Sequence, residues 1–283
     1  MTTGNKSEKH LEPSFVRSLG IGGIAGIIAA SCVYPLDISK AYMQVNRGSN
    51  LTIRQALAKV YASGGFRALY RGLPANIIGI TPEKAIKLSI FDYVRRRLGC
   101  ANPSAPFSWS KEAFAGGFAG FCQFVATNPM EIVKLRLQLA GPGSSLAGVV
   151  RDLGVRGLFR GSTATLSRDI PFSAGYFSSF AYLKRSWGTD PLNVFAASLT
   201  AGIGFAWICT PMDVVKTRLQ GSQELAAMYN GSVIKCFTMV AKDEGAKALF
   251  KGAGARVTLL GPLFGIALTS YSIIESLWAE YLI

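Results

Sequence analysis

The sequence predicts an all-α membrane protein with six transmembrane helices, built as three copies of one unit. The chain is apolar: 49% of its 283 residues are hydrophobic and 16% are charged, whereas soluble domains carry about 25% charged residues. Six apolar stretches are roughly 20 residues long, the length of a transmembrane helix. They begin near residues 15, 75, 113, 163, 194 and 253.

Several of these stretches contain charged residues. A charge at membrane depth is costly and usually faces the protein interior, so we expect these helices to line a polar path. The net charge of +14 comes without a nucleic-acid-binding motif, which favours contact with anionic lipid over nucleic acid.

Composition also excludes several classes of site. Five cysteines are scattered without a CxxC pair, and the one histidine, His10, lies in a polar head. This pattern supports neither a disulfide framework nor a metal site. No nucleophile and base stand at a spacing typical of an enzyme, so we expect no catalytic residue, no cofactor and no metal.

An internal repeat organises the chain. Three segments align without gaps: YPLDISKAYMQ from Tyr34, NPMEIVKLRLQ from Asn128 and TPMDVVKTRLQ from Thr210. Downstream of them stand GGFRALYRG, LGVRGLFRG and EGAKALFKG, and upstream of each lies a small-xxx-small pattern that lets membrane helices approach closely.

A proline marks the second long helix of each unit. Pro82, Pro171 and Pro262 occupy one register and are expected to kink their helices. Each unit therefore has a long helix, a short amphipathic helix and a second long helix. After a polar head at 1–14, we place the repeats at 15–105, 106–189 and 190–283.

These motifs resemble those of the mitochondrial carrier family over nearly the whole chain. The resemblance implies a six-helix barrel with threefold pseudosymmetry, three short helices on the matrix side and a central substrate path. It also implies a multi-pass, monomeric protein of the mitochondrial inner membrane, with both termini in the intermembrane space.

The same resemblance assigns a gate to each end of the barrel. The matrix gate consists of an acid and a lysine from each repeated motif, with a bracing glutamine: Asp37, Lys40, Gln44, Glu131, Lys134, Gln138, Asp213, Lys216 and Gln220. Each acid is expected to pair with the lysine of the next repeat. The cytoplasmic gate is incomplete, since its positions hold Asp92, Arg95, Lys184 and Glu275, and Asp92 with Lys184 is the candidate pair.

The resemblance further implies cardiolipin sites where a glycine opens the start of each second long helix. Backbone N–H groups at a helix start favour an anion. The residues concerned are Arg71, Gly72, Arg160, Gly161, Lys251 and Gly252. For any single copy, a plain helix start is an equally good interpretation.

An asymmetric solute needs residues that break the threefold pattern, and these surround the three prolines. The candidate contacts are Gly79, Ile80, Glu83, Lys84, Lys87, Arg168, Asp169, Ser173 and Leu259. Arg168 can bind a carboxylate through two hydrogen bonds, Asp169 can accept from an ammonium, and Lys84 or Lys87 can bind a second carboxylate. An internal ion pair that only stabilises packing is the alternative.

The local sequences GITPEKAIKL, SRDIPFSAGYF and GPLFGIA resemble those of the mitochondrial glutamate carriers. That resemblance implies glutamate transport with a proton, or against hydroxide. Two alternatives stay open: exchange of aspartate, glutamate or another amino acid, and a proton-leak or uncoupling carrier of the same fold.

Overall fold

The computed structural model describes residues 15–45, 52–70, 72–100, 105–140, 162–221, 232–250 and 252–281, with single residues at 102, 148, 151, 154, 159 and 229. Within these residues every regular element is helical. The predicted head at 1–14 lies outside the described residues.

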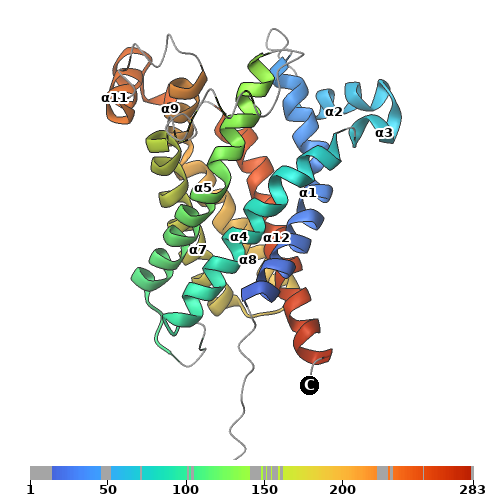
Figure 1. Cartoon of the computed structure of the whole chain (residues 1–283), viewed down its shortest axis with the longest axis vertical. Coiled ribbons are helices and arrows are strands. Elements are labelled where there is room, and N and C mark those ends of the chain that lie inside the picture. Colours follow the sequence, from blue (N-terminus) through green and yellow to red (C-terminus); the bar gives the residue numbers. More distant parts are fainter. Residues whose placement is uncertain are drawn as a thin grey trace, which may run out of the picture.

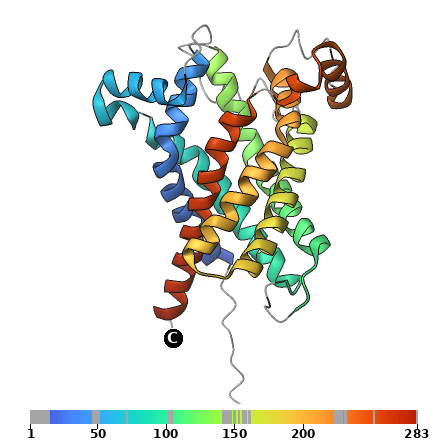
Figure 2. The same ribbon diagram turned by 180° about the vertical axis from the view of Figure 1, so that it is seen from behind.

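Long helices form the wall of a closed barrel (Figures 1 and 2). They are α1 (Phe15–Val45), α4 (Leu73–Arg97), α5 (Trp109–Ala140), α7 (Ser162–Trp187), α8 (Pro191–Ile208) continued by α9 (Thr210–Gly221), and α12 (Ala253–Tyr281). Each long helix packs against the next one along the chain, in the order α1, α4, α5, α7, α8 and α12, and α12 packs against α1. The chain thus closes into a six-membered ring, as predicted.

Short helices cluster at one end of the barrel (Figure 1). These are α2 (Ile53–Ala62) with α3 (Gly65–Leu69) in the first repeat, and α11 (Val233–Asp243) with the 3₁₀-helix Ala246–Phe250 in the third. A capping box between Thr52 and Gln55 starts α2. The short helix expected in the second repeat falls outside the described residues.

The predicted prolines lie inside continuous helices. Pro82, Pro171 and Pro262 stand in α4, α7 and α12. By length and apolarity alone, three described segments could span a membrane: Phe15–Ser39, Pro191–Ile208 and Arg256–Trp278. The helices α4, α5 and α7 are long enough but carry more polar and charged side chains, and α4 and α7 carry the site described below.

Small residues set the distance between the helices. A Cβ on Gly116 of α5 would lie 2.5 Å from the backbone oxygen of Ser173 in α7, and one on Gly120 would lie 2.7 Å from the Ser173 Oγ. Only glycine permits this approach, which agrees with the small-xxx-small pattern.

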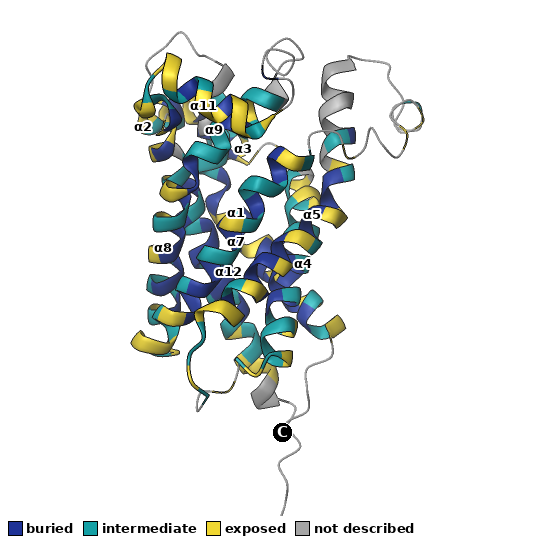
Figure 3. Cartoon of the chain, turned by 90° about the vertical axis from the view of Figure 1, so that its left-hand side faces the viewer, coloured by how far each residue is buried: buried dark blue, intermediate teal, exposed yellow. Residues whose placement is uncertain are grey.

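The main hydrophobic core lies in the half of the barrel away from the short helices. It contains residues from α1, α4, α5, α7, α8 and α12, among them Ile21, Phe91, Tyr176, Val194 and Phe264. Figure 3 shows the buried residues along the barrel wall. Outside the core, Phe114, Phe118, Phe121 and Val125 lie exposed on one face of α5, as expected for a lipid-facing surface.

Candidate functional site

Helix α4 places three charged side chains, Glu83, Lys84 and Lys87, inside the barrel within five residues after Pro82. The side chains of Lys84 and Lys87 are buried, and Glu83 is partly exposed. Lys84 Nζ lies 3.2 Å from Glu83 Oε1 and 4.2 Å from the centre of the Phe264 ring. This arrangement is a buried, partly compensated cationic patch.

Lys87 has a different environment. Its Nζ lies 5.9 Å from the centre of the Phe172 ring and 6.0 Å from that of Phe264. Among the described residues no acid lies within ion-pair distance of it, although Asp169 and Glu83 act on it electrostatically. Cation–π contacts stabilise a desolvated ammonium only in part, so Lys87 can take an anionic ligand.

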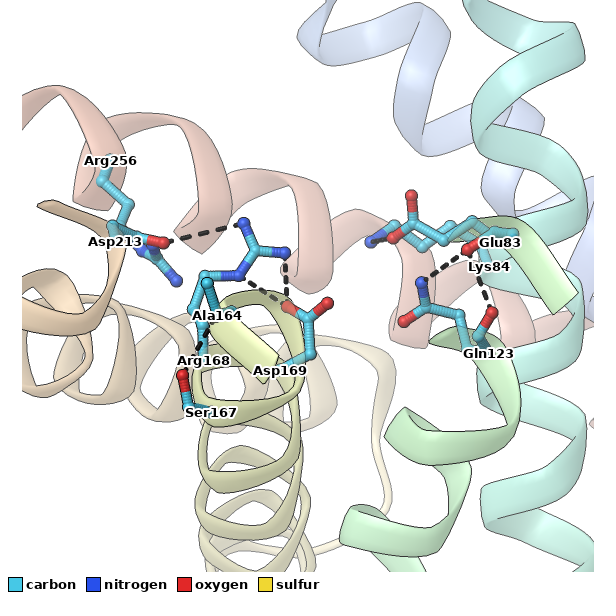
Figure 4. A network of polar contacts seen from close by, with 10 residues as sticks. Glu83, Lys84, Gln123, Ala164, Ser167, Arg168, Asp169, Asp213 and Arg256 are labelled. Carbon is cyan, nitrogen blue, oxygen red and sulfur yellow. Dashed lines mark hydrogen bonds and ion pairs between the residues drawn. The ribbon is translucent and has the colours of Figure 1, made fainter. Parts of the chain in front are cut away.

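Helix α7 presents the adjacent pair Arg168 and Asp169 toward this patch (Figure 4). Arg168 Nε donates to Asp169 Oδ1 at 2.6 Å, and Asp169 is buried. Lys87 and Lys216 act on Asp169 electrostatically. Asp169 therefore lies among cations of α4, α7 and α9, which compensate its negative charge.

The structure adds Arg256 of α12, which the motif comparison missed. Arg256 forms an ion pair with Asp213 of α9, and Asp213 Oδ1 lies 3.6 Å from Arg168 Nη1 (Figure 4). The only candidate contact predicted near Pro262 is Leu259, an uncharged residue. Arg256 is a charged residue in an apolar stretch, and that signal alone could have found it.

The remaining predicted contacts are uncharged, and their role in binding stays a prediction. Leu259 packs with Ala29 and Val33 in an apolar cluster between α1 and α12. Ser173 lies in the seam between α5 and α7, and Gly79 is exposed on α4. Ile80 is half-buried one turn before Lys84. The charged core of the site is therefore Glu83, Lys84, Lys87, Arg168, Asp169, Asp213 and Arg256.

The matrix-gate residues are described only in part. The side chains of Lys40, Gln44, Glu131, Lys134, Gln138 and Gln220 lie outside the described residues. Asp37 and Lys216 are half-buried. Asp213 pairs with Arg168 and Arg256 in this structure, and the predicted ring of gate ion pairs stays a prediction.

At the opposite end, the structure corrects the expected pairing of Asp92 with Lys184. Asp92 Oδ2 accepts from Arg96 Nε at 2.8 Å, and Arg96 also contacts Glu275. Arg95 instead binds the buried Glu112 of α5, with Nε 2.7 Å from Oε1. Lys184 acts electrostatically with both Asp92 and Glu275 but is not the residue that bridges them.

Of the six predicted lipid-site residues, Gly72 and Gly252 are described. They precede α4 and α12 with φ of 95° and 94°, a left-handed conformation that favours glycine. Arg71, Arg160, Gly161 and Lys251 lie outside the described residues, and lipid binding stays a prediction.

Comparison with known proteins gives the same threefold organisation. The "Mitochondrial carrier protein" family matches residues 11–102, 105–191 and 188–282. Two human proteins, the mitochondrial electrogenic aspartate/glutamate antiporters SLC25A13 and SLC25A12, are each 41% identical to the chain. The alignments span 274 and 273 residues, 90% of this chain but 40% of each antiporter.

A Dictyostelium discoideum protein named mitochondrial substrate carrier family protein X is 41% identical over 289 residues, which cover 96% of this chain and 95% of that protein. The three matched units agree with the closed helical ring and with the three repeated motifs. The chain therefore belongs to the mitochondrial carrier family, as a multi-pass protein of the mitochondrial inner membrane and not an enzyme.

Proposed function

We propose that the protein transports an acidic amino acid, glutamate, across the inner membrane by alternating access. The observation that carries this proposal is the asymmetric charged core, in which Arg168 and Asp169 of α7 lie opposite the buried lysines of α4. A zwitterion with a second carboxylate needs one acid and two separate cationic groups, and this core supplies both.

Each charge on glutamate has a candidate partner. Arg168 binds the α-carboxylate through two parallel hydrogen bonds, and Asp169 accepts from the ammonium. Lys87 binds the side-chain carboxylate, because Lys84 already pairs with Glu83 at 3.2 Å. The described core holds four cations and three acids, and Lys216 of α9 adds a positive charge near Asp169. A substrate with a net negative charge therefore reduces the excess positive charge of the core.

Glu83 is the candidate carrier of a coupled proton. Moving a net charge against the membrane potential costs about 2.3 kcal/mol per 100 mV, and a proton bound together with glutamate removes that cost. Both acids are paired, but Glu83 lies 3.2 Å from its partner Lys84, whereas the contact of Asp169 with Arg168 is shorter, at 2.6 Å. In this scheme Glu83 takes up the proton and Asp169 stays charged to bind the ammonium.

Exchange is the second candidate function, and the names of the two human relatives favour it. Both are called electrogenic aspartate/glutamate antiporters and are 41% identical to this chain across its carrier repeats. An exchanger would use the same charged core but would require an amino acid on each side.

Cardiolipin binding at the three glycine-opened helix starts and a monomeric state complete the proposal. The left-handed conformations of Gly72 and Gly252 support the first, because each glycine directly precedes the start of a long helix, where backbone N–H groups favour an anion.

Uptake into proteoliposomes tests the proposal. Glutamate should accumulate in vesicles without internal amino acid when the outside is acidic. If uptake ignores the pH gradient and requires internal aspartate or glutamate, the protein is an exchanger. If proton flux proceeds without any amino acid, the uncoupling alternative is correct and the proposed function is wrong.

A further inference from the structure

Asp213 occupies a position between two arginines from different helices. Its Oδ1 lies 3.6 Å from Arg168 Nη1 of α7, and its Oδ2 forms an ion pair with Arg256 Nη1 of α12. The two carboxylate oxygens are thus divided between two guanidinium groups, as they would be in the recognition of a free carboxylate. Figure 4 shows Arg168 with Asp213 on one side and Asp169 on the other.

Arg256 has capacity for a further acceptor. Its side chain is 14% exposed, and its buried Nε has no hydrogen-bond partner among the described residues. The guanidinium carbon lies 5.4 Å from the centre of the Phe172 ring, so one face is covered by an aromatic side chain. A buried guanidinium with an unused donor is costly, and a second oxygen at this edge would satisfy it.

The two arginines need an anion in every state of the protein. Removing the partner of a buried charge is strongly destabilising. Asp169 contacts Arg168 directly and acts on Arg256 only from beyond ion-pair distance. If Asp213 leaves, another carboxylate has to take its place.

We propose that Arg256 and Arg168 form a carboxylate clamp and that Asp213 fills this clamp when no substrate is bound. A carboxylate of the substrate replaces Asp213, so Arg256 is a substrate-binding residue that the motif positions do not identify. The inference rests on the proposed function, because the occupant is taken to be a carboxylate of an acidic amino acid.

This exchange of carboxylates links binding to gating. Asp213 belongs to the repeated motif TPMDVVK, whose acids are predicted to close the matrix gate by pairing with a lysine of another repeat. In this structure both carboxylate oxygens of Asp213 are taken up by the two arginines, so pairing with a gate lysine would require Asp213 to leave at least one of them. Substrate binding therefore releases Asp213 for gate closure, and the differential contacts of the two states provide the coupling that alternating access requires.

Thermal unfolding of the purified protein, with glutamate titrated, tests the clamp. Asp213→Asn should lower the glutamate concentration at half-maximal stabilisation, because the competing carboxylate is gone. If Asp213 fills the clamp in about nine molecules of ten, the decrease is about tenfold. Arg256→Gln should raise that midpoint by about tenfold or more, and Asp213→Asn should bring no improvement when added to Arg256→Gln. Asp213→Ser replaces Asp213→Asn if the asparagine variant does not fold.

Glu244→Gln is the matched control, because Glu244 also pairs with an arginine, with Oε2 2.6 Å from Arg218 Nη2, but outside the charged core. It should leave the glutamate midpoint unchanged. An unchanged or higher midpoint in Asp213→Asn overturns the competition, and a normal midpoint in Arg256→Gln overturns the clamp.

A second ligand separates failure of the clamp from failure of the proposed function. Succinate has two carboxylates and no ammonium. If succinate stabilises the protein and amino acids do not, the proposed substrate is wrong, and the same variants test the clamp with succinate. If no carboxylate stabilises the unmodified protein, both the clamp and the proposed function are wrong.

Discussion

Arg96 of α4 binds Glu275 of α12, with Nη2 2.5 Å from Oε1, and thereby joins the first repeat to the third. The same guanidinium donates a hydrogen bond from its Nε to Asp92 Oδ2, at 2.8 Å. The ends of α4 and α12 that carry this contact lie opposite the short helices, and the hydrophobic core contains residues of all three repeats. Arg96 is therefore the bridging cation at this end of the structure.

Replacement of Arg96 should weaken closure of this end. We expect Arg96→Gln to lower the free energy of unfolding by about 1 kcal/mol. The loss is small because the side chains of Arg96 and Glu275 are each about one-third exposed, and solvent weakens such an ion pair. It corresponds to a Tm lower by about 2 °C. Arg97→Gln is the control, since exposed Arg97 contacts the Tyr93 ring and should change Tm less. Glu275→Gln should add nothing to Arg96→Gln, and additive losses would contradict the pairing.

Arg168 should be required for substrate recognition. We expect Arg168→Ala to abolish stabilisation by glutamate, and Arg168→Lys to fail as well, because an ammonium lacks the planar fork that holds a carboxylate. The measurement is the rise in Tm at saturating glutamate. Arg185→Ala, at an exposed position of the same helix, should retain the full rise. Near-normal uptake by Arg168→Ala would remove Arg168 from the site.

Glu83 should determine the response to a pH gradient. In vesicles with an acidic exterior, a gradient of about one pH unit can support about tenfold accumulation of glutamate with one proton. We expect Glu83→Gln to lose this accumulation, because an amide takes up no proton, while Glu83→Asp keeps it. Gradient-driven uptake by Glu83→Gln would show that another group carries the proton.

Two adjacent glycines of α5 should respond oppositely to alanine. At Gly116 the new Cβ would meet backbone oxygen at 2.5 Å, whereas at Gly117 its nearest contacts are side-chain carbons at 3.6 Å. Gly116→Ala should therefore cost about 1–3 kcal/mol by overpacking, and Gly117→Ala should be neutral or slightly stabilising. Comparison of the two Tm values checks this, and equal losses would contradict the helix seam.

The sequence by itself determined the class of protein and its threefold construction. The proline-acid-lysine motif occurs three times, and three further prolines stand in one register. These repeats predict a repeated pair of helices, because residues at the same spacing in each copy take the same place on a helix. The same spacing singled out Arg168 and Asp169, whose adjacency in an apolar stretch breaks the threefold pattern. These inferences need no knowledge of which helices touch.

Only the tertiary structure decided which charges meet. Positions related by the repeat predicted a pair of Asp92 with Lys184, and near Pro262 they indicated only the uncharged Leu259. The barrel instead brings Arg96 to Glu275 and Arg256 to Asp213. The physical reason is that a long side chain can contact a residue a turn or more away along a neighbouring helix. Which residue it contacts depends on how the helices cross, and a buried charge must have a partner because an unpaired buried ion is costly.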